Sequence, residues 1–539
     1  MSKFDEKGAS VEVQDASDLE GSSFEEYSYN HIFRDPAVAE HYRGVYEKCE
    51  YECRHLFDPE YTWTKEEEKK VVWKLEWRVT LWAFIMFTSL NFDRFNLSQA
   101  LSTSFLKDLH MNTNQLNIGN TLNLVFFLIS ELPSQLISKK IGADVWIPTQ
   151  IVLWSVVSIT QSSITTPAGF YVTRCLLGAL QGGFICEVGL WMSYFYTTSE
   201  FPLRLSIFYM SNSFTIVISS LLAFALLKIK TEAISQSWRW LFIVEGLLTL
   251  VIGLASFFLM PASAAQTKAW YRPNGWFTDH EEKIVVNRVL RDDPSKGDMH
   301  NREPVHANEL LKTILDYDHL PVYLIRFLID MGTHPIATYL QIVLRGIGFT
   351  TFETNALTIP YSIITIICIF SIGYFSEKVN SRALTLAIVP TWVLSCLIPL
   401  RFWPNAQKDK WGTFALLTVL LGHPTDNPLT NSWVSANSNS VRSRAVSTAI
   451  VNMFSQAGTI VGANIYREDD RPLYHRGNSA LIGINFAALA VTIISRFYYK
   501  WRNSQKERAW NELDIKQQEE YLSGTTDEGN KRLDFKFTY

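Results

Sequence analysis

Residues 240–260 read WLFIVEGLLTLVIGLASFFLM, an apolar run in which Glu245 is the one charged residue. A helix needs about 20 mostly apolar residues to cross the hydrocarbon core of a bilayer. This run has that length, and it offers no polar face to water. It therefore predicts a membrane-spanning helix, and the question for the fold is how many similar runs the chain contains.

Similar runs lie on both sides of this one, and the longest polar stretch after the first run, residues 261–318, separates six predicted spans from six. The residues are 47% hydrophobic and 19% charged, whereas soluble proteins average about 25% charged. We predict an all-α membrane protein with twelve transmembrane helices in two six-helix bundles. The other predicted spans are 78–97, 116–138, 146–163, 168–190, 205–227, 320–343, 354–376, 383–400, 411–434, 443–465 and 479–499.

The segments outside the spans give the domain boundaries. Residues 1–62 are acidic and serine-rich and are expected to be mostly disordered, while Thr64 and Glu67 form a capping box that begins a short interfacial helix. In the central loop, WFTDHEEKIVVNRVLRDDPSKGD predicts one amphipathic helix that ends at Pro294 and Gly297. The predicted parts are a cytosolic N-terminal tail (1–77), a first bundle (78–260), a cytosolic central loop (261–319), a second bundle (320–499) and a cytosolic C-terminal tail (500–539).

Charge distribution sets the orientation and excludes several partners. Lysine and arginine are more frequent on the side of the termini and central loop, which places both termini in the cytosol. The start, MSKFDEKGAS, lacks the apolar segment of a signal peptide. A net charge of −4 does not favour nucleic acid, and Cys49 with Cys53 is too weak a pattern for a metal site. We expect a multi-pass plasma-membrane monomer surrounded by lipid, without metal or cofactor.

Charged residues inside predicted spans need a reason, because each costs about 2.5–3.5 kcal/mol at the bilayer centre on insertion scales. Asp93 and Arg94 in the first span suit a coupling site, in which anion entry changes the protonation of the carboxylate; the alternative is an anchor at the water interface. Arg174 and Gln181 share a face of the fourth span with two glycines that allow close helix packing, Gly178 and Gly182. Arg174 either binds an oxyanion or neutralises Asp93.

The seventh span carries Arg326, Asp330 and His334 on one face. An intrahelical ion pair that hides charge from lipid is one interpretation, and contact of Arg326 or His334 with substrate is the other. Glu131 in the second span precedes Pro133, which favours a structural hydrogen bond at a kink.

Several motifs resemble the major facilitator superfamily. Gly373-Tyr-Phe-Ser-Glu377-Lys378-Val-Asn-Ser-Arg382 is similar to its cytosolic loop motif, with Glu where Asp is usual, and Arg174-Cys-Leu-Leu-Gly178 resembles its Arg-x-x-x-Gly element. Asp93-Arg94-x-Asn96, Trp238-Arg-Trp-Leu-Phe-Ile-Val-Glu245-Gly246, Trp276-Phe277-Thr278 and Asn452-Met-Phe-Ser-Gln456 resemble the fungal allantoate-permease group of anion:cation symporters. Leu290 to Asp298 looks most like the members linked to sulfonates and other sulfur anions.

This resemblance implies a proton-coupled importer of a small organic or sulfur-containing anion. It implies proton coupling at Asp93, anion binding at Arg94, a cavity position for Arg174, and a gating loop with Gly373, Glu377, Lys378 and Arg382. Many relatives have glutamate where this chain has Gln181, which cannot titrate but can donate two hydrogen bonds to an anion. Either coupling falls on Asp93 alone, or transport is driven differently. A non-transporting nutrient sensor is the alternative. A membrane enzyme is disfavoured, because neither HExxH nor GxSxG occurs.

Overall fold

The structure is a computed structural model, and its described residues fold into two compact units. The helical unit contains Val79–Ser193, Glu200–Ala262 and the described residues from 316 onward, and the small unit contains residues 31–78, 194–197 and 263–297. The described residues are 31–34, 36–48, 51–197, 200–229, 236–297, 316–379, 381–403, 409–438, 441–471, 474–514, 517–518, 521, 529–533 and 535–539.

The first half of the helical unit contains the helices that precede the central loop. The predicted span 168–190 is divided at Gly182 and Gly183, and Gly183 has a φ of +84°, which favours glycine. Helix α6 packs against α10, α5 against α7, and α3 against α9 and α10. The bounds are α3 (Leu81–Ala100), α4 (Phe105–Asp108), α5 (Thr113–Ile141), α6 (Ala143–Thr160), α7 (Pro167–Gln181), α8 (Phe184–Ser193), α9 (Phe201–Leu226) and α10 (Ser237–Leu259).

The second half repeats this plan after the central loop. The predicted span 411–434 forms two helices, because Pro424 and Pro428 have no N–H to continue one ladder. Helix α13 packs against α19 and α20, and α16 against α20. The bounds are α13 (Leu320–Gly346), α14 (Thr351–Ala356), α15 (Ile359–Val379), α16 (Arg382–Phe402), α17 (Lys410–Leu421), α18 (Asn427–Asn437), α19 (Val441–Gly462) and α20 (His475–Asn511).

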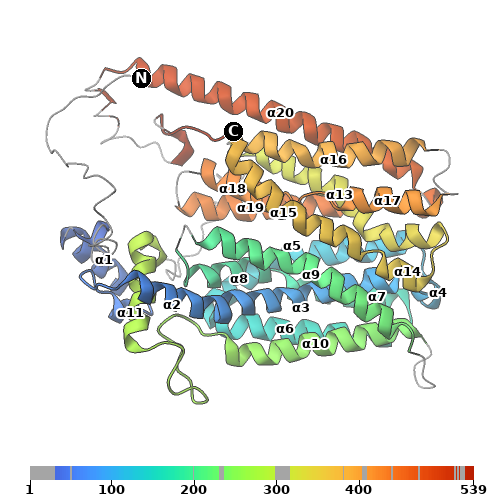
Figure 1. The fold of residues 1–539 in the computed structure, drawn as a ribbon, viewed down its shortest axis with the longest axis horizontal. Helices are drawn as coiled ribbons and strands as arrows, with labels where there is room; N and C mark the ends of the chain where they lie inside the picture. The colour runs from blue at the N-terminus through green and yellow to red at the C-terminus, as the bar shows by residue number, and fades with distance from the viewer. Residues whose placement is uncertain are drawn as a thin grey trace. The chain divides into compact units, whose positions relative to one another are not determined.

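The long helices of the helical unit run side by side (Figure 1). By length and composition, 8 helical segments in the described part of the chain are apolar enough to cross a membrane: Thr113–Ser138, Ala143–Ser163, Pro167–Ser193, Leu203–Leu226, Ser237–Leu259, Thr351–Ile369, Arg382–Phe402 and His475–Asn511. The other predicted spans are also helical, as α3, α13, α17 with α18, and α19. Charged residues in α3 and α13 and the break before α18 make these segments less apolar. The all-α prediction is confirmed.

The small unit corrects the expectation for the N-terminal region. Residues 1–30 lie outside the described part, but residues 31–34, 36–48 and 51–62 are ordered rather than disordered. They contain α1 (Pro36–Lys48), and Phe57 contacts Phe33 and Tyr46 edge to face, with ring centres 5.0 and 5.2 Å apart. The physical reason is that these aromatic side chains supply a hydrophobic core, which the acidic composition of the segment obscures.

The central loop completes this small unit. Helix α11 (Asp279–Asp292), followed by a turn at Pro294–Gly297, confirms the predicted amphipathic helix. It packs against α2 (Lys65–Leu75), which begins with the predicted capping box of Thr64 and Glu67. Lys74 of α2 forms an ion pair of 2.6 Å with Glu281 of α11. The N-terminal region and the central loop therefore fold together, although about 200 residues separate them.

Candidate functional site

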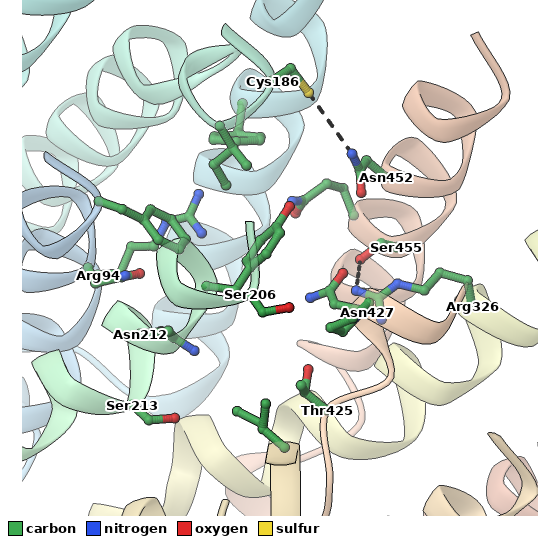
Figure 2. A pocket seen from close by; sticks show the side chains of 18 of the residues that line it. Arg94, Cys186, Ser206, Asn212, Ser213, Arg326, Thr425, Asn427, Asn452 and Ser455 are labelled. Carbon is green, nitrogen blue, oxygen red and sulfur yellow. Dashed lines mark hydrogen bonds between the residues drawn. The ribbon is translucent and has the colours of Figure 1, made fainter. Parts of the chain in front are cut away.

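A cavity of about 200 Å³ lies within the helical unit, and both halves of that unit line it. Figure 2 shows Arg94 from the first half and Arg326 from the second on opposite sides of this space. Most of the remaining polar groups are amides and hydroxyls. The principal lining residues are Phe87, Asn91, Arg94, Phe127, Glu131, Cys186, Ser206, Tyr209, Asn212, Ser213, Arg326, Thr425, Asn427, Asn452, Ser455 and Gln456.

Arg94 projects from α3 into the cavity. Its guanidinium carbon lies 5.0 Å from the centre of the Phe127 ring, a cation–π contact. No described carboxylate forms an ion pair with it. A half-buried guanidinium in this position keeps its donors available for a guest in the cavity.

Arg326 faces the cavity from α13 but has its own partners. Its Nε lies 3.0 Å from a carboxylate oxygen of Asp330, one helical turn away, and its Nη1 pairs with Asp426. The Nη2 group donates to Ser455 at 3.0 Å. Two carboxylates therefore compensate one guanidinium, so this arginine adds no net positive charge to the cavity.

Asp93 and Arg174 are buried but are not among the residues that line the cavity. Asp93 accepts a hydrogen bond from Ser158 of α6, and Arg174 donates from Nη2 to Asn120 of α5 at 3.4 Å. The two side chains are close enough for their charges to interact, without a direct ion pair between them. The charge of Arg174 also interacts with that of Arg94 on the cavity wall.

Gln181, Gly178 and Gly182 lie where α7 meets α5. A Cβ atom at Gly178 would overlap the backbone carbonyl of Asn123, and one at Gly182 would overlap Ser130. The absence of side chains allows the two helices to approach closely. The Gln181 amide is buried at the end of α7, its nitrogen has no hydrogen-bond partner in the described structure, and it does not line the cavity.

The remaining predicted residues lie at the edge of the cavity or away from it. His334 is near enough to Arg94 for their charges to interact, and its ring bonds to Thr338 at 3.2 Å, but it does not line the cavity. Gly373, Glu377 and Lys378 fall in the last turns of α15, and their side chains lie outside the described structure. Arg382 begins α16 and donates to Ser432 of α18.

Several cavity residues are beyond what sequence reasoning selected. Asn91 lies one turn before Arg94, and this spacing was an available signal. Ser455 lies between Asn452 and Gln456 in a motif quoted above, so a signal was available there too, whereas Cys186 and Tyr209 had none. Glu131, predicted as a structural residue, lines the cavity as well, and Cys186 donates to one of its oxygens at 3.3 Å.

Hydrogen bonds join the two halves near the loops that follow α3, α13 and α19. Thr113 donates from its backbone N–H to Glu468 at 3.0 Å, and Asn117 donates to the carbonyl of Tyr466 at 2.8 Å. Asn355 donates to Ser102 at 3.0 Å. Deeper in the cavity, Asn452 of the second half contacts the sulfur of Cys186 at 4.0 Å (Figure 2).

Comparisons with known proteins agree with this architecture. The family model described as Major Facilitator Superfamily matches residues 83–463. The uncharacterized transporter YIL166C of Saccharomyces cerevisiae is 42% identical over 520 residues, which cover 96% of each chain. The MFS-type transporter efuF of Hormonema carpetanum is 26% identical over 77% of this chain and 82% of its own.

Solved structures show the same fold at low sequence identity. A bacterial homologue of the human lysosomal transporter Spinster has a TM-score of 0.57 at 12% identity and covers 78% of this chain and 96% of its own. The xylose transporter XylE from E. coli has a TM-score of 0.57 at 11% identity, over 77% of this chain and 96% of its own. The two-bundle fold, the family match and the relatives together show that this chain is a membrane transporter that belongs to the major facilitator superfamily.

Proposed function

We propose that this protein is a secondary active transporter that uses protons to import a small organic or sulfur-containing anion. It acts in the plasma membrane with both termini in the cytosol, as a monomer. The sequence motifs that resemble the allantoate-permease group suggest allantoate, a vitamin-type carboxylate or a sulfonate as the substrate class.

The observation that carries the proposal is the position of Arg94. It lies on the wall of a cavity that both halves of the transporter line, and it has no carboxylate partner among the described residues. A buried charge is costly unless an opposite charge compensates it. A carboxylate or sulfonate in the cavity supplies that charge and accepts parallel hydrogen bonds from the guanidinium.

The neutral lining residues suit the remainder of such a substrate. Asn427, Asn452 and Gln456 of the second half present amide groups to the cavity, and Ser206 and Asn212 present polar groups from the first. Because the substrate contacts both halves, rocking of one half against the other would carry it across the membrane. Arg174 and Asp93 are buried outside the cavity lining, and in this proposal the charge of Arg174 supports the site through its interaction with Arg94.

Uptake into proteoliposomes tests the proposal. The purified protein is reconstituted and offered radiolabelled allantoate, nicotinate, pantothenate and isethionate, at external pH 5 and pH 7.5 with the interior at pH 7.5. We expect accumulation of at least one anion, faster at pH 5, and no accumulation of a neutral amide of the same size. Failure to accumulate any of the anions at either pH would contradict the proposal.

A further inference from the structure

Glu131 is a carboxyl on the cavity wall to which the proposed function gives no role. It is 5% exposed, in the middle of α5. One carboxyl oxygen accepts a hydrogen bond from the Cys186 thiol at 3.3 Å, and the other is buried without a hydrogen-bond partner in the described structure. A purely structural carboxylate in a protein interior normally has both oxygens satisfied. The carboxyls of Asp93, Glu187 and Glu245 also have an unpartnered buried oxygen in the described structure, but of these four only Glu131 lines the cavity. Its free oxygen therefore suggests a group that exchanges a proton with the cavity.

The charges around the cavity indicate what that proton controls. Arg326 is already compensated by Asp330 and Asp426, so the second half contributes no net positive charge. In the first half, Arg94 contributes one positive charge and an ionised Glu131 one negative charge. Protonation of Glu131 removes that negative charge from the cavity wall, so the cavity binds an anion at Arg94 more strongly when Glu131 is protonated.

Other ionisable side chains lie near Glu131. Cys186 and Glu187 come from α8, and Tyr209 of α9 lies close enough to interact with its charge. Arg94 and Arg326 share the cavity but form no ion pair with it. Helix α19 presents the neutral amide of Asn452, and no described ionisable side chain of α6 or α7 hydrogen-bonds to Glu131.

We propose that Glu131 is the proton-binding residue that couples proton entry to anion entry, and that the transported species is a monoanion. One proton neutralises Glu131, one anion then binds at Arg94, and release of the proton on the other side expels the anion. Binding of the proton raises the affinity for the anion, and binding of the anion raises the affinity for the proton by the same factor, because linkage between two sites is reciprocal. Of the two arginines that line the cavity, only Arg94 has no described carboxylate partner, so a dianion would remain half compensated. This inference rests on the proposed function.

The test compares two kinds of flux for wild type and Glu131→Gln, using whichever anion of the four-anion panel the wild type accumulates. Counterflow exchange at equal pH needs no net proton movement, whereas accumulation under a pH gradient does. We expect E131Q to keep counterflow within about threefold of wild type, to lose accumulation, and to show flat uptake from pH 5 to pH 7.5. Glu187→Gln is the matched control, because Glu187 accepts from Ser134 at 2.7 Å and does not line the cavity; it should keep the wild-type pH profile.

Two substitutions of the neighbouring thiol test the inference if E131Q does not fold. Cys186→Ala removes the donor that favours the ionised carboxylate, so acid stimulation of uptake should shift to higher pH, by about 0.5–1 unit. Cys186→Ser offers a stronger donor and should shift it to lower pH. Gradient-driven accumulation by E131Q with the wild-type pH profile would overturn the inference, as would its loss of counterflow in a folded protein, or equal pH profiles for both Cys186 variants. Absence of any anion flux in the wild type would overturn the proposed function instead.

Discussion

Arg94 and Arg326 face the same cavity from opposite halves of the transporter, yet Arg326 has two carboxylate partners and Arg94 has none among the described residues. The two guanidinium groups therefore have the same chemistry but different electrostatic surroundings. Arg326 joins α13 to the segment before α18 and is part of the fold. In the proposed function, Arg94 keeps its hydrogen-bond donors for a substrate.

Replacement of Arg326 should therefore damage stability before it damages transport. Arg326→Gln leaves Asp330 and Asp426 buried without a cation, and breaking a buried pair in this way costs about 3–5 kcal/mol. We expect a low yield of monodisperse protein and a lowered midpoint of thermal unfolding in detergent. If R326Q unfolded at the wild-type temperature, Arg326 would not have the structural role described here.

The close packing of α5 against α7 predicts that a side chain added at Gly178 lowers the stability of the protein. Gly178→Ala places a methyl group against the Asn123 carbonyl and should destabilise the protein by about 1–3 kcal/mol. Gly189→Ala in α8 is the matched control, since a Cβ there meets no atom within 4 Å. Thermal unfolding of the two purified variants checks this, and equal unfolding temperatures would show that the helix contact tolerates a methyl group.

The ion pair between Lys74 and Glu281 predicts a pH dependence for the small unit. Burial opposes ionisation of Glu281, but hydrogen bonds from Lys74 and Thr278 outweigh it and lower the pKa of the carboxyl. Since the folded pKa is depressed, the stabilisation is complete above the unfolded pKa and is lost as pH falls through the folded value. The partly exposed pair is worth about 0.2–1 kcal/mol.

Hydrogen exchange of α2 and α11 measures this effect. Both helices should exchange faster at pH 4 than at pH 6 after correction for intrinsic rates, and the difference should shrink in Lys74→Gln. If the exchange rates in K74Q depended on pH as they do in wild type, carboxyl groups other than Glu281 would cause the effect.

Hydrophobic runs made the helical architecture predictable, because a span needs a minimum apolar length whatever its partners. The same reasoning could not find the charge balance at Arg326. Asp330 is one turn away on the same helix and was visible in the sequence, whereas Asp426 is 100 residues away and reaches Arg326 only through the fold.

Two other features show the limits of sequence reasoning. The cavity-facing side of α5 depends on how α5 packs against its neighbours, so Glu131 was interpreted as a kink residue although it lines the cavity. Residues 31–62 have an acidic composition that is typical of disorder. Their aromatic side chains form a core in the small unit, to which α11 of the central loop also belongs.

The central claim is that Arg94 supplies the charge that holds the anion. The most direct measurement is isothermal titration calorimetry, at pH 5, of the anion that the wild type accumulates, with wild-type protein, Arg94→Gln and Arg94→Lys. Loss of charged hydrogen bonds should weaken binding to R94Q by about 10- to 100-fold, with a smaller loss for R94K and little change in thermal unfolding. Binding to a folded R94Q with the wild-type affinity would contradict the account.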